Sequence, residues 1–354
     1  MSTSIKSDVK ANKVAGFGAL LMTTFLVGCS EPPKLESVEG YAQGTAYQIS
    51  FWSEDAVPVT EIQTTFNDTL TQIDKELSTY RPDSFISEFN RSLSVAWQPT
   101  SQDFVDLVKI AQDIHAKSEG CYDPTIGPLF DLWGFKTDKL HVPTPEELTA
   151  LKSELGIDKI EIDEENLRVR KTRPFLQLDF SSMGEGYTIG KLSDVLETKG
   201  YDNYMVQFGG DMKIKGHKPN GDKWRVAIQS PIPSADDAPK VYQAMTVVDE
   251  NGVTLDTSGT YNRHFDDNGV EYSHIINPST GKPITHDLVS ASVLGTDPRI
   301  SDAWATTMLC LGPLEGAKIA KNENLEVFFI ERKNDKLVNA SSAALLKTNR
   351  IKFD

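Results

Sequence analysis

The sequence has few cysteines and no surplus of positive charge. Three cysteines occur in 354 residues, and no cysteines and histidines lie at a spacing that zinc sites use. The chain holds 36 lysines and arginines against 51 aspartates and glutamates, a formal net charge of −15. So acidic a chain argues against nucleic acid as a partner and against broad contact with anionic lipid. No internal repeat of fixed period is present.

One apolar run lies near the N-terminus. Three lysines precede the stretch VAGFGALLMTTFLV, which is too short to span a bilayer comfortably and is typical of a signal peptide. The run ends in LVGCS, which is similar to the lipobox of bacterial lipoproteins. We therefore expect residues 1–28 to be a lipoprotein signal peptide, Cys29 to carry lipid, and residues 29–37 to be a polar tether. An ordinary signal peptide cut nearby is the alternative.

Cleavage before Cys29 would remove three lysines and one aspartate, so the formal charge would change from −15 to −17. The remaining chain is long enough to bury a large core, in one domain or in two intimately joined ones. Its other cysteines are Cys121 and Cys310. They could pair in an oxidising compartment, but two cysteines so far apart in the sequence predict nothing by themselves.

Apolar periodicity predicts helices and strands in mixed runs. Thr144 with Glu147 fits a capping box, as does Thr60 with Gln63, and two Asn-Gly pairs (251–252 and 268–269) favour hairpin turns. Helices are predicted at 60–78, 102–118, 145–155 and 187–199 and from 301 onward. Strands are predicted at 45–52, 159–163, 167–170, 288–295 and 325–331 and through most of 204–276. Without a regular strand–helix alternation, the fold class is predicted to be α+β, with antiparallel sheets and packed helices.

The stretch LDFSSMGEGYTIG (residues 178–190) resembles a phosphate-binding turn. A short apolar strand is predicted to end at Asp179, and a glycine-containing turn then precedes a helix, where free backbone N–H groups favour anions. The turn nevertheless carries Glu185, whose negative charge would repel phosphate. Asp179 and the serines after it could equally be ordinary helix caps.

Two further stretches carry polar and aromatic side chains outside any obvious core pattern. STYRPDSFISEFN (78–90) follows a helix, and its Tyr80 could stack on a planar ring, although a capped loop explains the pattern as well. GCYDPTIGPLFDLWGF (120–135) combines two prolines and three glycines with several aromatics, so we expect an irregular segment. It could form the wall of a pocket or a tightly packed connection.

The stretch DPRISDAWATTMLCLG (297–312) predicts a helix capped by Ser301. Asp302 and Thr306 are four residues apart and therefore lie on one face of that helix. Asp302 could simply favour the helix dipole. A carboxylate and a hydroxyl in this arrangement also offer two hard oxygen ligands to Mg²⁺. His264 and His274 fall in a predicted hairpin, where hydrogen-bonded structural roles are the commoner ones.

Eight of these stretches, in the same order, resemble motifs of the ApbE flavin transferases, the FAD:protein FMN transferases. The matching pieces are QGT, STYRPDSFISEFN, YDPTIGPLFDLWGF, LDFSSMGEGY, QFGGDM, TSGTYNRHF, SHIINPSTGKP and SDAWATTMLCLG, spread over residues 38–350. The resemblance implies one ApbE-like domain over residues 38–354, of mixed α+β fold. The predicted lipobox also suits this family, many of whose members are periplasmic lipoproteins.

The resemblance implies an enzyme that uses FAD and Mg²⁺. Such an enzyme cleaves the pyrophosphate of FAD, attaches FMN through a phosphoester to a threonine or serine of a target protein, and releases AMP. The family's targets are flavoprotein subunits of membrane redox pumps of the Nqr and Rnf type. The alternatives are an FAD pyrophosphatase that gives FMN and AMP, or a lipid-anchored flavin-binding protein without turnover.

The family's site residues are carried over by motif position. Metal ligation falls on the main-chain oxygen of Ser182 and the side chains of Asp302 and Thr306. The family's flavin contacts fall on Gln43, Tyr80, Cys121, Tyr122, Asp123, Asp179, Glu185 and Ile275. Gln43 stands where the family usually has methionine, and Glu185 where many members have lysine. For the proton of the target hydroxyl, the candidate acceptors are Asp302 and His274.

The implied location is the periplasmic side of the inner membrane, through a lipid anchor at Cys29. Ser30 follows that cysteine where aspartate often signals retention in the inner membrane, so the outer membrane is the alternative. The sequence does not name the acceptor protein.

Overall fold

The computed structural model describes residues 33–137, 139–232, 240–260, 264–267, 270–334 and 336–354. Pro33–Asp354 forms one compact unit. Its first strand, β1, begins at Glu36, so the end of the predicted tether (29–37) already belongs to the sheet. Within the described ranges, no helix has the length and apolar character needed to cross a bilayer.

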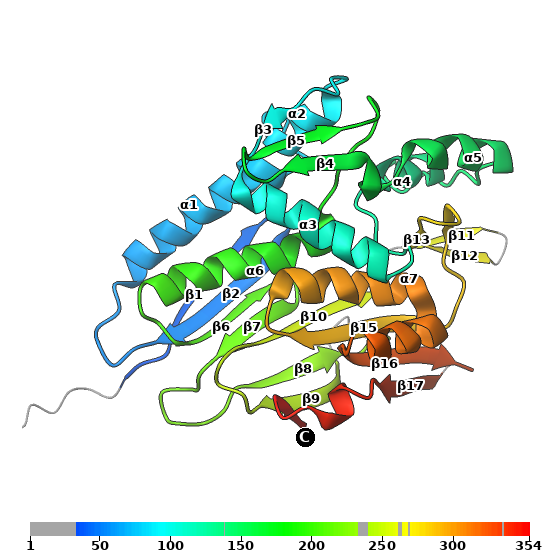
Figure 1. Cartoon of the computed structure of the whole chain (residues 1–354). Helices are drawn as coiled ribbons and strands as arrows, with labels where there is room; N and C mark the ends of the chain where they lie inside the picture. The colour runs from blue at the N-terminus through cyan, green and yellow to red at the C-terminus, as the bar shows by residue number, and fades with distance from the viewer. Residues whose placement is uncertain (1–32, 138, 233–239, 261–263, 268–269, 335) are drawn as a thin grey trace, which may run out of the picture. The chain divides into compact units, whose positions relative to one another are not determined.

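A fully antiparallel sheet of eight strands runs through the unit in the order β1-β2-β6-β7-β10-β15-β16-β17 (Figure 1). Its strands are β1 Glu36–Ala42, β2 Thr45–Trp52, β6 Asn203–Phe208, β7 Asp211–Lys215, β10 Val253–Gly259, β15 Leu288–Gly295, β16 Glu326–Lys333 and β17 Lys336–Ser341. In β2, the predicted alternation places Tyr47, Ile49 and Phe51 in the core. The antiparallel α+β class is confirmed.

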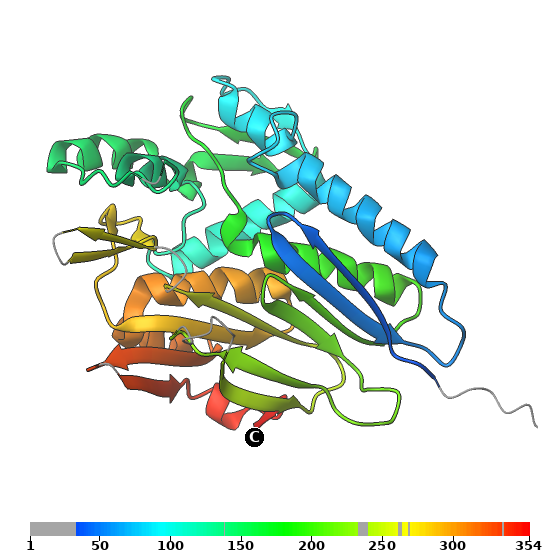
Figure 2. The ribbon, with the colours of Figure 1, turned by 180° about the vertical axis from the view of Figure 1, so that it is seen from behind.

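Helices α1, α6 and α7 cover one face of this sheet (Figures 1 and 2). The helices are α1 Val59–Leu77, α2 Phe85–Arg91, α3 Gln102–Lys117, α4 Gly127–Trp133, α5 Pro145–Glu154, α6 Ser181–Thr198 and α7 Pro298–Asn322, with short 3₁₀ turns at Ile157–Lys159 and Leu345–Lys347. Apolar side chains of α6 and α7 join those of the sheet in two large buried clusters. The two helices therefore lie side by side on the layer beneath them.

Smaller sheets complete the unit. β8 Arg225–Gln229, β9 Val241–Val247 and β18 Ile351–Phe353 pack against the other face of the large sheet through a third apolar cluster. β3 Gln98–Pro99, β4 Ile160–Asp163 and β5 Arg168–Lys171 form a separate sheet, while β11 His264–Asp267 pairs with β12 Val270–Ser273 and β13 Ile276–Asn277 with β14 Lys282–Pro283. The predicted turn at 268–269 lies outside the described residues, although the strands flanking it pair.

Several local predictions were wrong. Asn251-Gly252 makes no hairpin, because β9 before it and β10 after it belong to different sheets. Thr60 lies inside α1, which begins at Val59 without a side-chain cap, whereas the capping box of Thr144 is confirmed. The 120–135 stretch, expected to be irregular, contains the helix α4, which begins at Gly127 and tolerates Pro128 because proline suits the first turn of a helix.

Candidate active site

A cavity of about 580 Å³ lies among the β1–β2 turn, the end of α1 and the start of α6. Four residues predicted to contact flavin share it: Gln43, Tyr80, Asp179 and Glu185. Its other lining residues are Gly44, Ile73, Asp74, Leu77, Ser78, Thr79, Phe180, Ser181, Gly184 and Phe208. The cavity thus joins segments that lie far apart in the sequence.

Gln43 and Tyr80 line the cavity in different ways. Gln43 has a positive φ of 52° at the tip of the β1–β2 hairpin, and its side-chain oxygen accepts a hydrogen bond from the Thr188 hydroxyl at 2.9 Å. That bond ties the hairpin tip to α6. Tyr80 is 96% exposed. Its ring is thus free to meet a planar ligand, and α2 begins after it with Ser84 as the N-cap.

Asp179 is held by main-chain contacts rather than by a strand. Residues 176–180 form no ladder, which corrects the predicted strand. Instead of a neighbouring strand, the side-chain amide of Asn90 bonds to the backbone of this segment. Its nitrogen donates to the Leu178 carbonyl and its oxygen accepts from the Leu178 N–H, both at 2.8 Å. The Asp179 N–H donates to the Pro124 carbonyl at 2.8 Å, and its carboxylate accepts the Ser181 N–H at 2.9 Å.

The glycines of the GEG stretch lie inside α6, which begins at Ser181, and not in a turn before it. A Cβ on Gly186 would lie 2.1 Å from the Pro298 carbonyl oxygen, so only glycine permits this approach of α6 to α7. The Gly186 N–H donates to Asp302 Oδ2 at 2.9 Å. In a helix this N–H would serve the Ser182 carbonyl, which therefore keeps acceptor capacity for another partner.

Asp302 and Thr306 lie on α7, where that helix faces α6 and β10. Asp302 is 6% exposed, and the Thr306 hydroxyl lies 2.9 Å from the Ser258 hydroxyl of β10. The N-cap of α7 is Asp297 rather than the predicted Ser301, whose hydroxyl pairs with Thr254 inside the structure. The i, i+4 spacing on one helix face is confirmed.

Four carboxylates form an acidic cluster at this junction: Asp211, Asp256 and Asp302 are buried, and Glu185 is half-buried. Burial raises the pKa of Glu185 and of Asp302 to about 7, and raises that of Asp211 and Asp256 well above the ordinary value. Apart from burial, the charges that raise the pKa values of the three aspartates are other members of the cluster. Glu185 fits because Gly209 has no side chain: a Cβ there would lie 2.1 Å from Glu185 Oε2.

The acidic cluster fits a cation. Neither carboxylate oxygen of Asp256 has a hydrogen-bond partner among the described residues, although the side chain is fully buried. A buried carboxylate without a partner is costly unless a cation or a proton neutralises it. Among the described residues, no three Asp, Glu, His or Cys side chains are grouped to hold one ion. The predicted ligand set needs only one carboxylate, with a hydroxyl and a main-chain carbonyl.

Tyr122, in the 121–123 run, contacts the first turn of α6. Its hydroxyl accepts a hydrogen bond from the Ser182 hydroxyl at 3.2 Å, and burial raises its pKa. Asp123 does not line the 580 Å³ cavity. Its buried carboxylate accepts two hydrogen bonds from Thr125 and borders a separate cavity with His115.

The remaining predicted residues lie away from the cavity lining. Ile275 is buried, and its N–H donates to the Ser273 hydroxyl at 3.1 Å. His274 is half-buried between β12 and β13. Neither lines the 580 Å³ cavity. Cys121 forms a disulfide with Cys310, which answers the question that the sequence left open.

The family model of the ApbE family matches residues 43–329. The chain belongs to the ApbE family. Among curated ApbE relatives, the FAD:protein FMN transferase of Salmonella typhimurium is 36% identical and is aligned over 88% of this chain and 90% of its own. The corresponding enzyme of Escherichia coli K12 is 34% identical, over 93% and 94%.

Solved ApbE structures have the same fold. The flavin transferase ApbE from Vibrio cholerae superposes with a TM-score of 0.77 at 31% identity, covering 88% of this chain and 99% of that one. The apo crystal structure of the Pseudomonas stutzeri flavinyl transferase ApbE gives a TM-score of 0.79 at 32% identity, over 88% and 96%. The mixed fold inferred from the ApbE motifs is thus confirmed.

Sequence reasoning missed Asp211 and Asp256 of the acidic cluster, and Asn90, which holds the backbone next to Asp179. Asn90 ends the motif STYRPDSFISEFN and Asp211 lies in QFGGDM, so a polar residue inside a quoted motif was the available signal. Asp256 lies in a β-strand with no local feature that marks it. Only the pairing of β10 with β7 and β15 brings it to the cluster.

Proposed function

We propose that this chain is an FAD:protein FMN transferase. It would cleave the pyrophosphate of FAD, transfer FMN to a threonine or serine hydroxyl of a target protein, and release AMP. One observation carries the proposal: Glu185 lines the cavity together with Gln43, Tyr80 and Asp179, and the next residue, Gly186, donates its N–H to Asp302 of the acidic cluster. The names of the relatives support the same reaction.

The proposed metal is Mg²⁺, held by the Ser182 carbonyl and by the side chains of Asp302 and Thr306. When bound, Mg²⁺ would neutralise negative charge on the pyrophosphate and on the departing AMP. Asp302 approaches the start of α6 through its bond to the Gly186 N–H, which brings its carboxylate near the Ser182 carbonyl. Thr306 follows one helical turn later, and all three ligands are oxygens, as Mg²⁺ prefers.

The chain's own residues would bind and orient FAD. Tyr80 offers an exposed ring for stacking, and Glu185 offers an acceptor for an amine or a ribose hydroxyl. Asp302 and His274 are the candidate acceptors for the proton of the target hydroxyl. Neither side chain lines the cavity, and we rank Asp302 first because it accepts the N–H of Gly186, the residue after the cavity-lining Glu185.

The proposed targets are flavoprotein subunits of membrane redox complexes of the Nqr and Rnf type. A lipid anchor at Cys29, after removal of residues 1–28, would hold the enzyme on the periplasmic side of the inner membrane, near such targets. The disulfide between Cys121 and Cys310 supports an oxidising compartment, because disulfides persist there and are rare in the cytosol.

The test is a transfer assay with the purified chain, FAD, and a purified acceptor subunit of this type. With Mg²⁺ we expect covalent flavin fluorescence on the acceptor band in a denaturing gel, and none after chelation by EDTA. Mg²⁺-dependent formation of AMP and free FMN, without flavin on the acceptor, would support the pyrophosphatase instead. FAD binding without any AMP would support a flavin-binding protein.

A further inference from the structure

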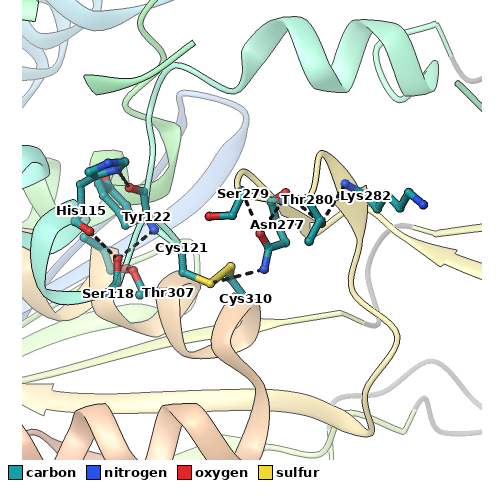
Figure 3. Close-up of a disulfide and its surroundings, with 11 residues drawn as sticks. His115, Ser118, Cys121, Tyr122, Asn277, Ser279, Thr280, Lys282, Thr307 and Cys310 are labelled. Atoms are coloured by element: carbon teal, nitrogen blue, oxygen red, sulfur yellow. Dashed lines mark hydrogen bonds between the residues drawn. A yellow bond between two sulfur atoms is a disulfide. The ribbon is translucent and has the colours of Figure 1, made fainter. Parts of the chain in front are cut away.

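The disulfide between Cys121 and Cys310 joins two parts of the candidate active site (Figure 3). Cys121 begins the 121–123 run after α3. Cys310 lies on α7, one helical turn beyond Thr306 and two beyond Asp302. One covalent bond therefore connects the segment that carries Tyr122 to the helix that carries the proposed metal ligands.

Hydrogen bonds around the disulfide orient Tyr122. Its N–H donates to the Ser118 hydroxyl at 3.1 Å, and its carbonyl accepts from His115 Nδ1 at 2.7 Å (Figure 3). Its hydroxyl meets Ser182, whose carbonyl is a proposed metal ligand. A displacement of Cys121 would therefore move the Tyr122 ring and alter its contact with the first turn of α6.

The last residue of β13 also contacts the disulfide. Asn277 Nδ2 lies 3.8 Å from Cys121 Sγ, and the Asn277 side-chain oxygen accepts the N–H groups of Ser279 and Thr280 (Figure 3). Ile275, a predicted flavin contact, lies two residues before Asn277. Three segments with predicted ligand contacts, the 121–123 run, α7 and the segment from Ile275, thus meet at one covalent bond.

The helix has a weak point immediately beyond Cys310. Gly312 is non-helical, with φ of 73°, and Pro313 has no N–H to give to the Leu309 carbonyl. A helix end that loses its hydrogen bonds frays unless another contact holds it. The disulfide provides that contact within one turn of Thr306.

We propose that the Cys121–Cys310 disulfide is a positioning element for flavin binding, and that its reduction weakens FAD binding by the folded enzyme. The inference rests on the proposed function. A dithiol reductant would supply two electrons and two protons: the S–S bond breaks, two thiols form, and the reductant becomes a disulfide. Reduction releases the 121–123 run from α7, so Tyr122 no longer keeps one position against Ser182.

The test compares the Kd of FAD for the full chain in its oxidised form, after treatment with dithiothreitol, and after reoxidation. Quenching of FAD fluorescence in EDTA reports binding without turnover. We expect reduction to raise the Kd about tenfold and reoxidation to restore it. Cys310→Ser should bind as weakly as the reduced enzyme and should not respond to reductant. Circular dichroism at the assay temperature shows whether each form is folded.

Ser342→Ala is a matched control for a loss of stability alone. Ser342 is buried and accepts the N–H groups of Val327 and Leu345, away from the cavity. It should lower the melting temperature without changing the Kd of FAD. If reduced and Cys310→Ser enzymes also melt earlier but keep the oxidised Kd, the disulfide is only a structural link and the inference fails. If the oxidised wild type binds no FAD, the proposed function fails first.

Discussion

The cavity and the acidic cluster beneath it are built in opposite ways. The cavity is lined by loop tips and helix ends, and Tyr80 on its rim is 96% exposed. The cluster lies on regular elements (β7, β10, α6 and α7), where Asp302 is 6% exposed and Asp256 fully buried. Exposed side chains can adapt to a ligand, whereas buried carboxylates are fixed before it arrives.

We infer that the cavity rim contributes mainly to ligand binding and the acidic cluster mainly to charge stabilisation. Side chains at the rim contribute contacts that are individually modest, because water competes for them. Burial disfavours negative charge on the cluster, and either a bound cation or protonation offsets that cost. Changes in the cluster should therefore alter turnover, and changes at the rim should alter affinity.

The largest expected effect follows the loss of Asp302. Asp302→Ala should lower the Mg²⁺-dependent transfer rate by roughly a hundredfold or more, because several kcal/mol of charge stabilisation at the transition state are lost. The fold should remain intact, as circular dichroism would show. Asp297→Ala is the matched control on the same helix: it removes an N-cap, costs about 1 kcal/mol of stability, and should keep transfer.

A smaller effect is expected from adding a methyl group where α6 and α7 approach each other most closely at Gly186. Gly186→Ala should destabilise the fold by about 1–3 kcal/mol in denaturant unfolding, because its Cβ would overlap the Pro298 carbonyl. Gly184→Ala lies half a turn away, where an added Cβ meets nothing within 4 Å, and should slightly stabilise α6. Equal stabilities for the two variants would contradict the close approach.

Glu185 lies between the two regions, so its replacement tests both. Glu185→Gln should weaken FAD binding by roughly tenfold, because the ligand loses a hydrogen bond to a charged carboxylate acceptor. The measurement is an FAD titration followed by fluorescence. A Kd unchanged from wild type, with transfer lost instead, would assign the side chain to the metal rather than to the ligand.

The same variant should change the pH dependence of stability. Burial raises the pKa of Glu185 from 4.5 to about 7, so the unfolded chain loses this proton at lower pH than the folded one. This group therefore lowers stability as pH rises from 4.5 to about 7, and its effect levels off above. In EDTA, as the pH rises from 4.5 to about 7, the melting temperature of Glu185→Gln should fall less than that of wild type. Parallel curves would contradict the buried placement.

The smallest expected effect is at the rim. Tyr80→Ala should weaken FAD binding by about 0.5–1.5 kcal/mol and leave the melting temperature unchanged, because the exposed ring packs against little. Tyr80→Phe keeps the ring and should bind FAD as wild type does. A Phe variant as weak as the Ala variant would show that the hydroxyl, not stacking, carries the contact.

Local pattern predicted the elements well where apolar spacing is regular, as in α1, α3 and β2. It failed where tertiary contacts decide. The Gly184–Gly186 stretch forms a helix because α7 packs against it, and Asn251-Gly252 connects two sheets rather than one hairpin. Motif order identified Gln43, Tyr80, Asp179 and Glu185, which one cavity unites. Asp256 joins the cluster only through strand pairing, which no local pattern reveals.

The most direct measurement is mass spectrometry of an acceptor flavoprotein subunit co-expressed with this chain. With the wild-type chain, the account predicts one added FMN on a single threonine or serine of the acceptor, and no addition with Asp302→Ala. An unmodified acceptor beside active wild-type enzyme that releases AMP and free FMN would contradict transfer. FMN addition undiminished with Asp302→Ala would contradict the role of the acidic cluster.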